Sequence, residues 1–139
     1  MAAEVRFFNR ELSWLEFNNR ILNQARNPGM PLLERLRFLS IISSNLDEFF
    51  MVRVGGLRTL MERGVTRPDP SGRTPAAQLE QISGRVRAML EGMRTCLLEE
   101  LEPLLEKEGI RRLQPAHLTP TQHRHAAGVR WAGCRRRIP

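Results

Sequence analysis

The longest regular pattern in the sequence runs from Pro75 to Gly109, where large apolar residues recur every three or four positions. This spacing matches one face of an α-helix, so the pattern predicts a single long helix. Thr74 before Pro75 is a helix-start signal, Gly109 is a stop signal, and Pro103 is expected to kink the last turns. The recurring residues are Leu79, Ile82, Val86, Met89, Leu90, Met93, Leu97, Leu101 and Leu104. Such a helix needs other helices or a sheet to cover its apolar face.

Two further segments carry helical patterns. The first is predicted from Asn9 to Asn27, with Asn9 as a plausible N-cap, and the second from Pro31 to about Arg63, with a bend expected at Gly55–Gly56. A loop rich in proline and glycine follows at 64–76, and no convincing strand precedes Ile110. We therefore predict an all-α fold. Residues 1–109 form a three-helix antiparallel bundle, and residues 110–139 form an irregular C-terminal tail that is the truncated start of a second domain.

The positive charge of the chain is concentrated at its end. The net charge is +7, yet residues 1–109 hold all 15 acidic residues and an equal number of basic ones, so the whole excess lies beyond them. A basic tail can bind nucleic acid or an anionic surface. The neutral body argues against a specific nucleic-acid binder, and any binding of that kind should disappear when residues 111–139 are deleted.

Histidine and cysteine do not form a recognisable metal motif. His117, His123 and His125 all lie in the tail, without a carboxylate at ligand spacing, and Cys96 and Cys134 are far apart. No metal site is expected, and Cys96 is interpreted as a core residue. The sequence shows neither a secretory signal nor an apolar run long enough to span a membrane, so a cytoplasmic location is expected.

Polar residues interrupt the predicted apolar faces. Glu11 and Asn18 project into the apolar arc of the first helix, while Ser43 and Asp47 fall near the apolar side of the second helix and Asn45 projects from its border. If such groups are buried they need hydrogen-bond partners. One interpretation is that they satisfy one another between helices. The other is that the second helix presents Asn45 to a ligand or to another domain, and the pattern alone favours the first.

Two long stretches carry a family resemblance. "FFNRELSWLEFNNRILNQA" (7–25) and "PLLERLRFLSIISSNLDEFFMVRVGGL" (31–57) contain the ordered elements E-L-S-W-L-x-F-N, P-L-x-E-R-L-R-F-L and S-N-L-D-E-F. The sequence from Phe7 to about Gln122 resembles the N-terminal region of the bacterial polyphosphate kinases, the family with a phosphohistidine intermediate.

The resemblance implies an enzyme that transfers the terminal phosphate of ATP reversibly to inorganic polyphosphate, with Mg²⁺ and as a homo-oligomer. It implies a cytoplasmic or membrane-peripheral enzyme whose N-terminal helical domain packs against the catalytic domains. It also implies that the asparagine of S-N-L-D-E-F, here Asn45, contacts the nucleotide. The alternative, from a different class, is a helical interaction or oligomerisation module without a ligand of its own.

The chain departs from the family in two respects. The family's phosphohistidine, metal-binding residues and polyphosphate tunnel belong to later domains, so the resemblance assigns no catalytic residue and no metal ligand here, and this fragment alone is expected to be inactive. After residue 127 the sequence "GVRWAGCRRRIP" has neither acidic residues nor an apolar period. The hypothesis for residues 125–139 is a truncated or frame-shifted reading of a longer gene.

Overall fold

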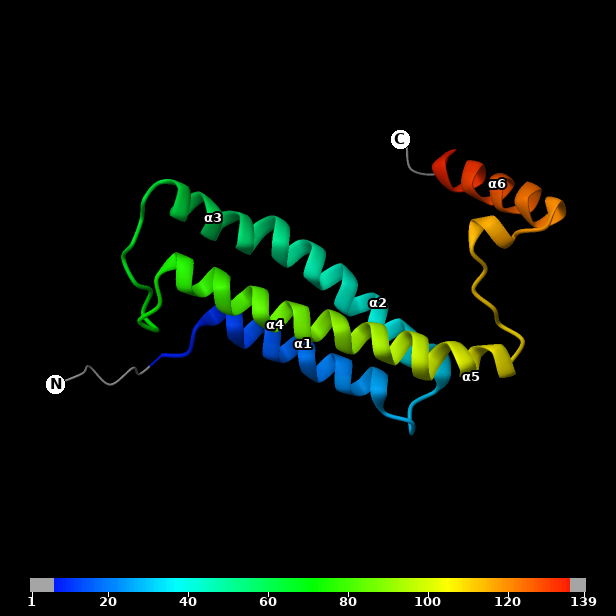
Figure 1. Ribbon diagram of the computed structural model, residues 1–139, viewed down its shortest axis with the longest axis horizontal. Helices are drawn as coiled ribbons and strands as arrows, with labels where there is room; N and C mark the ends of the chain where they lie inside the picture. Colours follow the sequence, from blue (N-terminus) through cyan, green and yellow to red (C-terminus); the bar gives the residue numbers. More distant parts are fainter. Residues whose placement is uncertain (1–6, 136–139) are drawn as a thin grey trace.

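The computed structural model describes residues 7–135, and these form helices and loops without a strand. Three helical segments pack side by side in alternating directions, which confirms the predicted all-α antiparallel bundle (Figure 1). The first is α1 (Arg10–Arg26). The second joins α2 (Leu32–Phe49), the π-helical turn η1 (Phe50–Val54) and α3 (Gly55–Glu62). The third joins α4 (Pro75–Thr95), the π-helical turn η2 (Cys96–Leu101) and α5 (Glu102–Lys107).

The predicted helix ends are confirmed by their hydrogen bonds. The Asn9 side chain accepts from the backbone N–H of Leu12 at 2.9 Å, and Thr74 accepts from that of Ala77 at 3.3 Å, ahead of Pro75. At the end of α5, Gly109 has a φ of +77°. The backbone N–H of Ile110, the next residue, donates to the carbonyl of Leu105 and so closes the helix. This left-handed backbone conformation carries little strain only for glycine.

Each of the two long segments contains a π turn. Buried residues of α2 follow helical steps up to Phe49, and the next buried side chain is Val54, five positions on. The same step of five separates Cys96 from Leu101 across η2. A π turn adds one residue to the helical turn and so rotates the apolar face. The irregularity of the second segment therefore lies at 50–54, directly before the Gly55–Gly56 pair at which a bend was expected, and both glycines begin the regular helix α3.

The irregularity of the third segment precedes Pro103. The proline ring clashes with the carbonyl four residues earlier in a regular helix, and the wider turn of η2 ends just before it. Of the predicted apolar stripe, Leu90 and Leu104 are exposed instead of buried, and Cys96 lies on the stripe, fully buried. The interpretation of Cys96 as a core residue is confirmed.

The core lies where the three segments meet. Arg35 brings a charge into it: this side chain is almost fully buried, donating at 2.6 Å both to the carbonyl of Ala25 and to the carboxylate of Glu100. This arginine ties the end of α1 to η2, and its charge is neutralised inside the bundle. The buried apolar residues of the core are Leu15, Leu22, Ala25, Leu39, Ile42, Leu46, Phe49, Val54, Leu57, Ile82, Val86, Met89, Cys96 and Leu101.

A polar network joins the loop 64–74 to the start of α1. Asp69 accepts through Oδ1 from the backbone N–H groups of Ser71 and Arg73 and from the Ser71 hydroxyl. Its Oδ2 accepts from Asn9, whose Nδ2 also donates to Gln78 on α4. Burial raises the pKa of Asp69, but the hydrogen bonds from Ser71, Arg73 and Asn9 outweigh burial and leave that pKa below its ordinary value.

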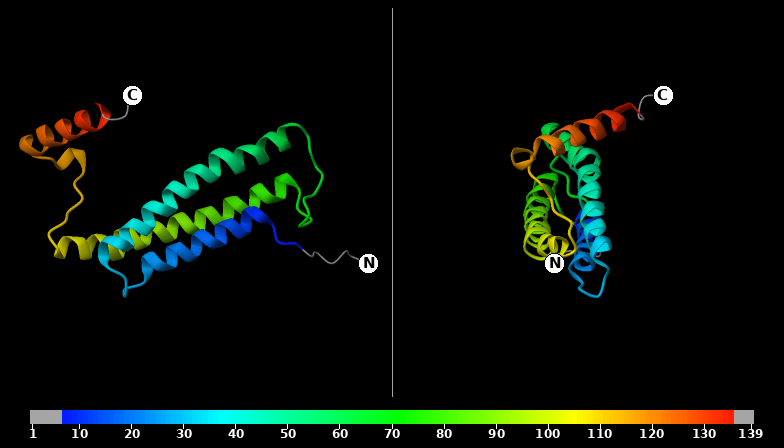
Figure 2. Two further views of the ribbon diagram at one scale, coloured as in Figure 1. Left: turned by 180° about the vertical axis from the view of Figure 1, so that it is seen from behind. Right: turned by 90° about the vertical axis from the view of Figure 1, so that its right-hand side faces the viewer.

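The expectation that the C-terminal tail is irregular is wrong in part. A 3₁₀ turn, η3 (Pro115–His117), precedes a regular helix, α6 (Pro120–Arg135). Thr119 and Gln122 exchange hydrogen bonds at the start of α6, and this local capping box does not need an apolar face. In Figure 1 and in the left view of Figure 2, α6 stands away from the bundle at the end of an extended link. Residues 136–139 of the predicted basic tail lie outside the described part.

No helix within the described residues is both long and apolar enough to cross a lipid bilayer.

Candidate functional site

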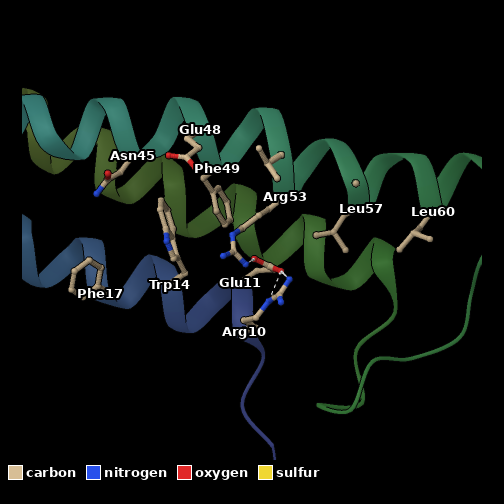
Figure 3. Close-up of a pocket in the computed structure, with 12 residues that line it drawn as sticks. Arg10, Glu11, Trp14, Phe17, Asn45, Glu48, Phe49, Arg53, Leu57 and Leu60 are labelled. Atoms are coloured by element: carbon tan, nitrogen blue, oxygen red, sulfur yellow. Dashed lines mark hydrogen bonds and ion pairs between the residues drawn. The ribbon is translucent and has the colours of Figure 1, made fainter.

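A groove runs between α1 and the long segment of α2 and α3, with a volume of about 600 Å³ (Figure 3). It is the largest of the principal hollows on the described part of the chain, and its two walls come from sequence stretches more than 25 residues apart. The lining residues are Arg10, Glu11, Trp14, Phe17, Asn45, Glu48, Phe49, Val52, Arg53, Gly56, Leu57 and Leu60. The residues Ser44–Phe49, the S-N-L-D-E-F motif, form the last turns of α2, so Asn45, Glu48 and Phe49 face the groove together.

Asn45 is tied to α1. Its Nδ2 donates to Oδ1 of Asn18 at 2.8 Å, and Nδ2 of Asn18 donates to the carbonyl of Trp14 at 3.0 Å. Asn18 is fully buried, whereas Asn45 is half-buried and borders the groove. None of the hydrogen bonds among the described residues uses Oδ1 of Asn45. The amide therefore keeps its carbonyl oxygen and its second Nδ2 proton for a ligand, while its other N–H joins the helices.

An aromatic pair forms the middle of the groove. The rings of Trp14 and Phe49 stack with their centroids 4.6 Å apart and their planes only 7° from parallel. Phe49 is buried, but Trp14 is only half-buried and lines the groove. Phe17 adds a third, more exposed ring one helical turn from Trp14. Such a wall offers a flat apolar surface to a planar ligand.

The ionisable groups of the groove balance one another. Glu11, a nearly buried carboxylate, accepts from Arg53 at 3.1 Å and from Arg10 at 3.4 Å (Figure 3). Glu48 is the other acidic residue on the wall, so two arginines face two glutamates. This neutral wall lacks the excess positive charge that a polyanion would require. The arrangement suits the uncharged end of a ligand better than a chain of phosphates.

Cys96 lies in the core of the bundle and not in the groove. Burial, followed by the charge of Glu100, raises the pKa of the Cys96 thiol, which favours the unreactive protonated form. Across the described residues, no three histidine, cysteine or acidic side chains are grouped as a metal site would need.

Residues 7–113 match the family model described as the polyphosphate kinase N-terminal domain. The chain belongs to the polyphosphate kinase family. It is 50% identical over 117 residues to a polyphosphate kinase of Lactiplantibacillus plantarum, with 84% of this chain and 16% of that protein covered. Its identity to a polyphosphate kinase of Rhodopirellula baltica is 49% over 127 residues, covering 88% of this chain and 15% of that protein.

A solved structure agrees with these sequence matches. The crystal structure of polyphosphate kinase from Porphyromonas gingivalis superimposes with a TM-score of 0.66 at 32% identity, covering 82% of this chain and 16% of that one. The chain thus spans about one sixth of the length of the polyphosphate kinases it matches. The resemblance inferred from the motifs is confirmed, and the matched part is the N-terminal helical domain.

Within this polyphosphate kinase domain, the structure separates the polar residues singled out from the sequence. Asn18 and Glu11 are buried as predicted, and Asn45 and Asn18 satisfy each other between helices. The placement of Ser43 and Asp47 near the apolar side is wrong, because both are exposed.

Arg10 and Arg53, which line the groove and pair with Glu11, were not identified from the sequence. A buried glutamate at position 11 was the available signal, since a carboxylate in an apolar arc requires a cationic or hydrogen-bonding partner.

Proposed function

We propose that this chain is the nucleotide-contacting helical domain of a polyphosphate kinase. In this proposal the whole enzyme transfers the terminal phosphate of ATP reversibly to inorganic polyphosphate through a phosphohistidine, and Asn45 contacts the nucleotide. The observation that carries the proposal is the position of Asn45, half-buried on the wall of the groove with an available acceptor. Membership of the polyphosphate kinase family supplies the reaction.

The groove would take the base end of the nucleotide. The stacked Trp14 and Phe49 give a planar apolar wall, and the balanced charges of the groove give no net attraction for the triphosphate. The phosphates would then extend away from the bundle, toward parts of the enzyme that correspond to no residue in this chain. Positioning of this kind is a large share of catalysis in phosphoryl transfer, because the protein contributes little covalent chemistry.

The other components of the reaction are assigned to the complete enzyme. The described residues do not fit a protein-held Mg²⁺ site, so Mg²⁺ is proposed to accompany the ATP phosphates, and no step is routed through it here. None of His117, His123 and His125 lies in the groove, and none is proposed as the phosphohistidine. Homo-oligomerisation, a cytoplasmic or membrane-peripheral location and polyphosphate binding belong to the same proposal for the whole enzyme.

Titration of the isotopically labelled 139-residue chain with ATP, followed by NMR, tests the nucleotide site. Signals of the groove residues should shift with ATP, and Asn45→Ala should weaken binding by about fivefold, the effect of one net hydrogen bond. Asn23→Ala is the matched control, because Asn23 is an exposed asparagine of α1 outside the groove. Shifts that are absent, or equally affected by both variants, would contradict a nucleotide site at Asn45.

A helical interaction module without a ligand is the second candidate function. The hydrogen bond between Asn45 and Asn18 favours it, because it gives Asn45 a structural role without any nucleotide. Exposed Met51 and Val52 on η1 also offer an apolar surface to another protein domain. In that case Asn45→Ala lowers the stability of the bundle and leaves the affinity for ATP unchanged.

A further inference from the structure

One face of the long segment formed by α2, η1 and α3 is turned away from the core. Its residues recur every three or four positions, and they are exposed or, in the case of Gly55, half-buried. None of them lines the groove, which lies along a neighbouring face of the same segment. In Figure 1 this segment forms one edge of the bundle. We call the set the outer face, and its members are Ser40, Ser44, Asp47, Met51, Gly55, Thr59 and Arg63.

The outer face has an apolar centre. Met51 is 75% exposed, more than any other large apolar side chain of the three helical segments of the bundle. Its neighbours in the chain, Phe50 and Val52, are exposed as well. Three consecutive apolar residues left in solvent in the middle of a helix are typical of a surface that another protein covers.

Gly55 lies one helical turn after Met51, and no contact within the described bundle requires a glycine there. Its φ of −55° is one that any residue adopts in a helix. A Cβ atom at this position would meet only the carbonyl oxygen of Phe50, at 3.7 Å, which is an ordinary contact. Glycine is less favourable than alanine inside a helix. The missing side chain therefore leaves room for the close approach of a helix from outside the bundle.

Opposite charges flank this centre symmetrically. Asp47 precedes Gly55 by eight residues and Arg63 follows it by eight. Both side chains are exposed, and neither takes part in a hydrogen bond or an ion pair with any residue that the structure describes. A two-fold axis through Gly55, perpendicular to the helix, exchanges the two ends of the outer face. It places Asp47 of one copy opposite Arg63 of another, at both ends, and Met51 opposite Thr59.

We propose that the outer face binds the same face of a second copy of this chain, with the two helical segments antiparallel and crossing at Gly55. Met51 of each copy packs beside Thr59 of the other, and Asp47 pairs with Arg63 at both ends of the contact. The face is thus complementary to itself in charge, as a two-fold interface requires. A single helix face buries little area, so the dimer is weak and forms at concentrations of about 0.1 mM or above. The nucleotide plays no part in this inference, because the outer face lies outside the groove.

Sedimentation equilibrium of the 139-residue chain measures the association, at an ionic strength of about 0.15 M that screens the basic tails from each other. We expect a monomer and a dimer in equilibrium, without larger species. Met51→Asp should weaken the dimer about tenfold or more, because it places a charge at the apolar centre. Leu90→Asp is the matched control. Leu90 is a half-exposed apolar residue of α4, outside the outer face, and this variant should dimerise like the unaltered chain.

Exchange of the two charges tests the antiparallel arrangement. Asp47→Arg alone and Arg63→Asp alone each place like charges together at both ends of the dimer, so each variant should dimerise about tenfold more weakly. An equimolar mixture of the two variants should recover the original affinity, because the mixed dimer has opposite charges at both ends again. Glu80→Arg and Arg87→Asp make the same changes of net charge at exposed positions of α4, and each should leave dimerisation unchanged.

Four results would overturn the inference. The chain could stay monomeric up to about 1 mM, or it could form species larger than a dimer. A dimer that Met51→Asp leaves unweakened would use another surface. A mixture of the two charge variants that associates no better than either variant alone would refute the antiparallel crossing. Circular dichroism of each variant checks that the helices are intact, and a failure here leaves the nucleotide site at Asn45 standing.

Discussion

Nδ2 of Asn45 lies 2.8 Å from Oδ1 of Asn18, a hydrogen bond that joins α2 to α1 across 27 residues of sequence. The same asparagine borders the groove between these helices. A change at Asn45 therefore affects the packing of the bundle and the wall of the groove together. Measurements of stability and of binding must be made on the same variants to separate the two effects.

We expect Asn45→Ala to lower the free energy of unfolding by about 1 kcal/mol, the net contribution of one hydrogen bond. In the Asn18→Leu background the same change should cost much less, because the acceptor is already absent. Urea denaturation of the unaltered chain, the two single variants and the double variant provides the measurement. Additive effects of the two substitutions would show that the hydrogen bond contributes nothing to stability.

We expect Glu11→Gln to raise the affinity for ATP relative to adenosine. The substitution removes the nearly buried charge that neutralises Arg10 and Arg53, so the groove gains net positive charge and attracts the triphosphate. The ratio of the affinity for ATP to that for adenosine should rise severalfold at low ionic strength and fall back at high ionic strength. Titrations with each ligand at two salt concentrations can detect this change.

The control for this change is Glu16→Gln. Glu16 also lies on α1 and is also paired with an arginine, Arg85, but it does not line the groove. A salt-dependent rise of the same size in both variants would show that the overall charge, and not the groove, controls the binding of ATP.

We expect Asp69 to make the stability of the loop dependent on pH in the acid range. Its pKa is lower in the folded chain than in the unfolded chain, so its contribution is complete above the unfolded value of about 4. That contribution is lost as the pH falls through the lower, folded value. Asp69→Asn should cost about 1 kcal/mol near neutral pH, and the difference from the unaltered chain should shrink as the pH falls below the unfolded value.

Thermal unfolding at several pH values measures this difference. Glu80→Gln serves as the control, because Glu80 is an exposed carboxylate of α4 without a hydrogen bond or ion pair to another described residue. A difference between Asp69→Asn and the unaltered chain that stays constant from neutral to acid pH would rule out the linkage.

We expect valine substitutions at the two glycines of α4 to have different effects on the free energy of unfolding. A Cβ atom at Gly92 would lie 2.6 Å from Nη2 of Arg26 and 3.1 Å from Cδ2 of Leu22, so a branched side chain must displace the arginine, which donates to the Gly92 carbonyl, and crowd the buried leucine. Gly92→Val should lower the free energy of unfolding by about 1–3 kcal/mol. Nothing lies within 4 Å of a Cβ at Gly84, so Gly84→Val should be neutral or slightly stabilising. Equal unfolding midpoints in urea for the two variants would contradict the close contact.

Predictions about helix ends succeeded because their causes lie within a few residues. Asn9 and Thr74 cap backbone N–H groups three positions ahead, and Gly109 supplies the backbone conformation that ends α5. The capping box of α6 is equally local, yet it was missed, because the prediction relied on an apolar period that this helix does not have.

Predictions about side-chain direction were less successful where the helix is not regular. A wheel drawn at a constant 100° per residue across 31–63 spans the π turn at 50–54, which shifts the apolar face by about one residue. The averaged direction was therefore displaced, and Ser43 and Asp47 were placed near a face that they do not occupy. A step of five between buried positions, as from Phe49 to Val54, marks such a turn only when burial is known.

The amino-acid sequence alone determined the all-α class, the three helical segments, their caps and the family, because these depend on short-range periodicity and on ordered motifs. Tertiary structure decided that Asn45 meets Asn18, that Glu11 holds Arg10 and Arg53, and that a neutral groove with a stacked aromatic wall lies between the helices. These contacts depend on the rotation of each helix about its own axis. That rotation is set by the packing of the whole core and not by neighbours in the chain.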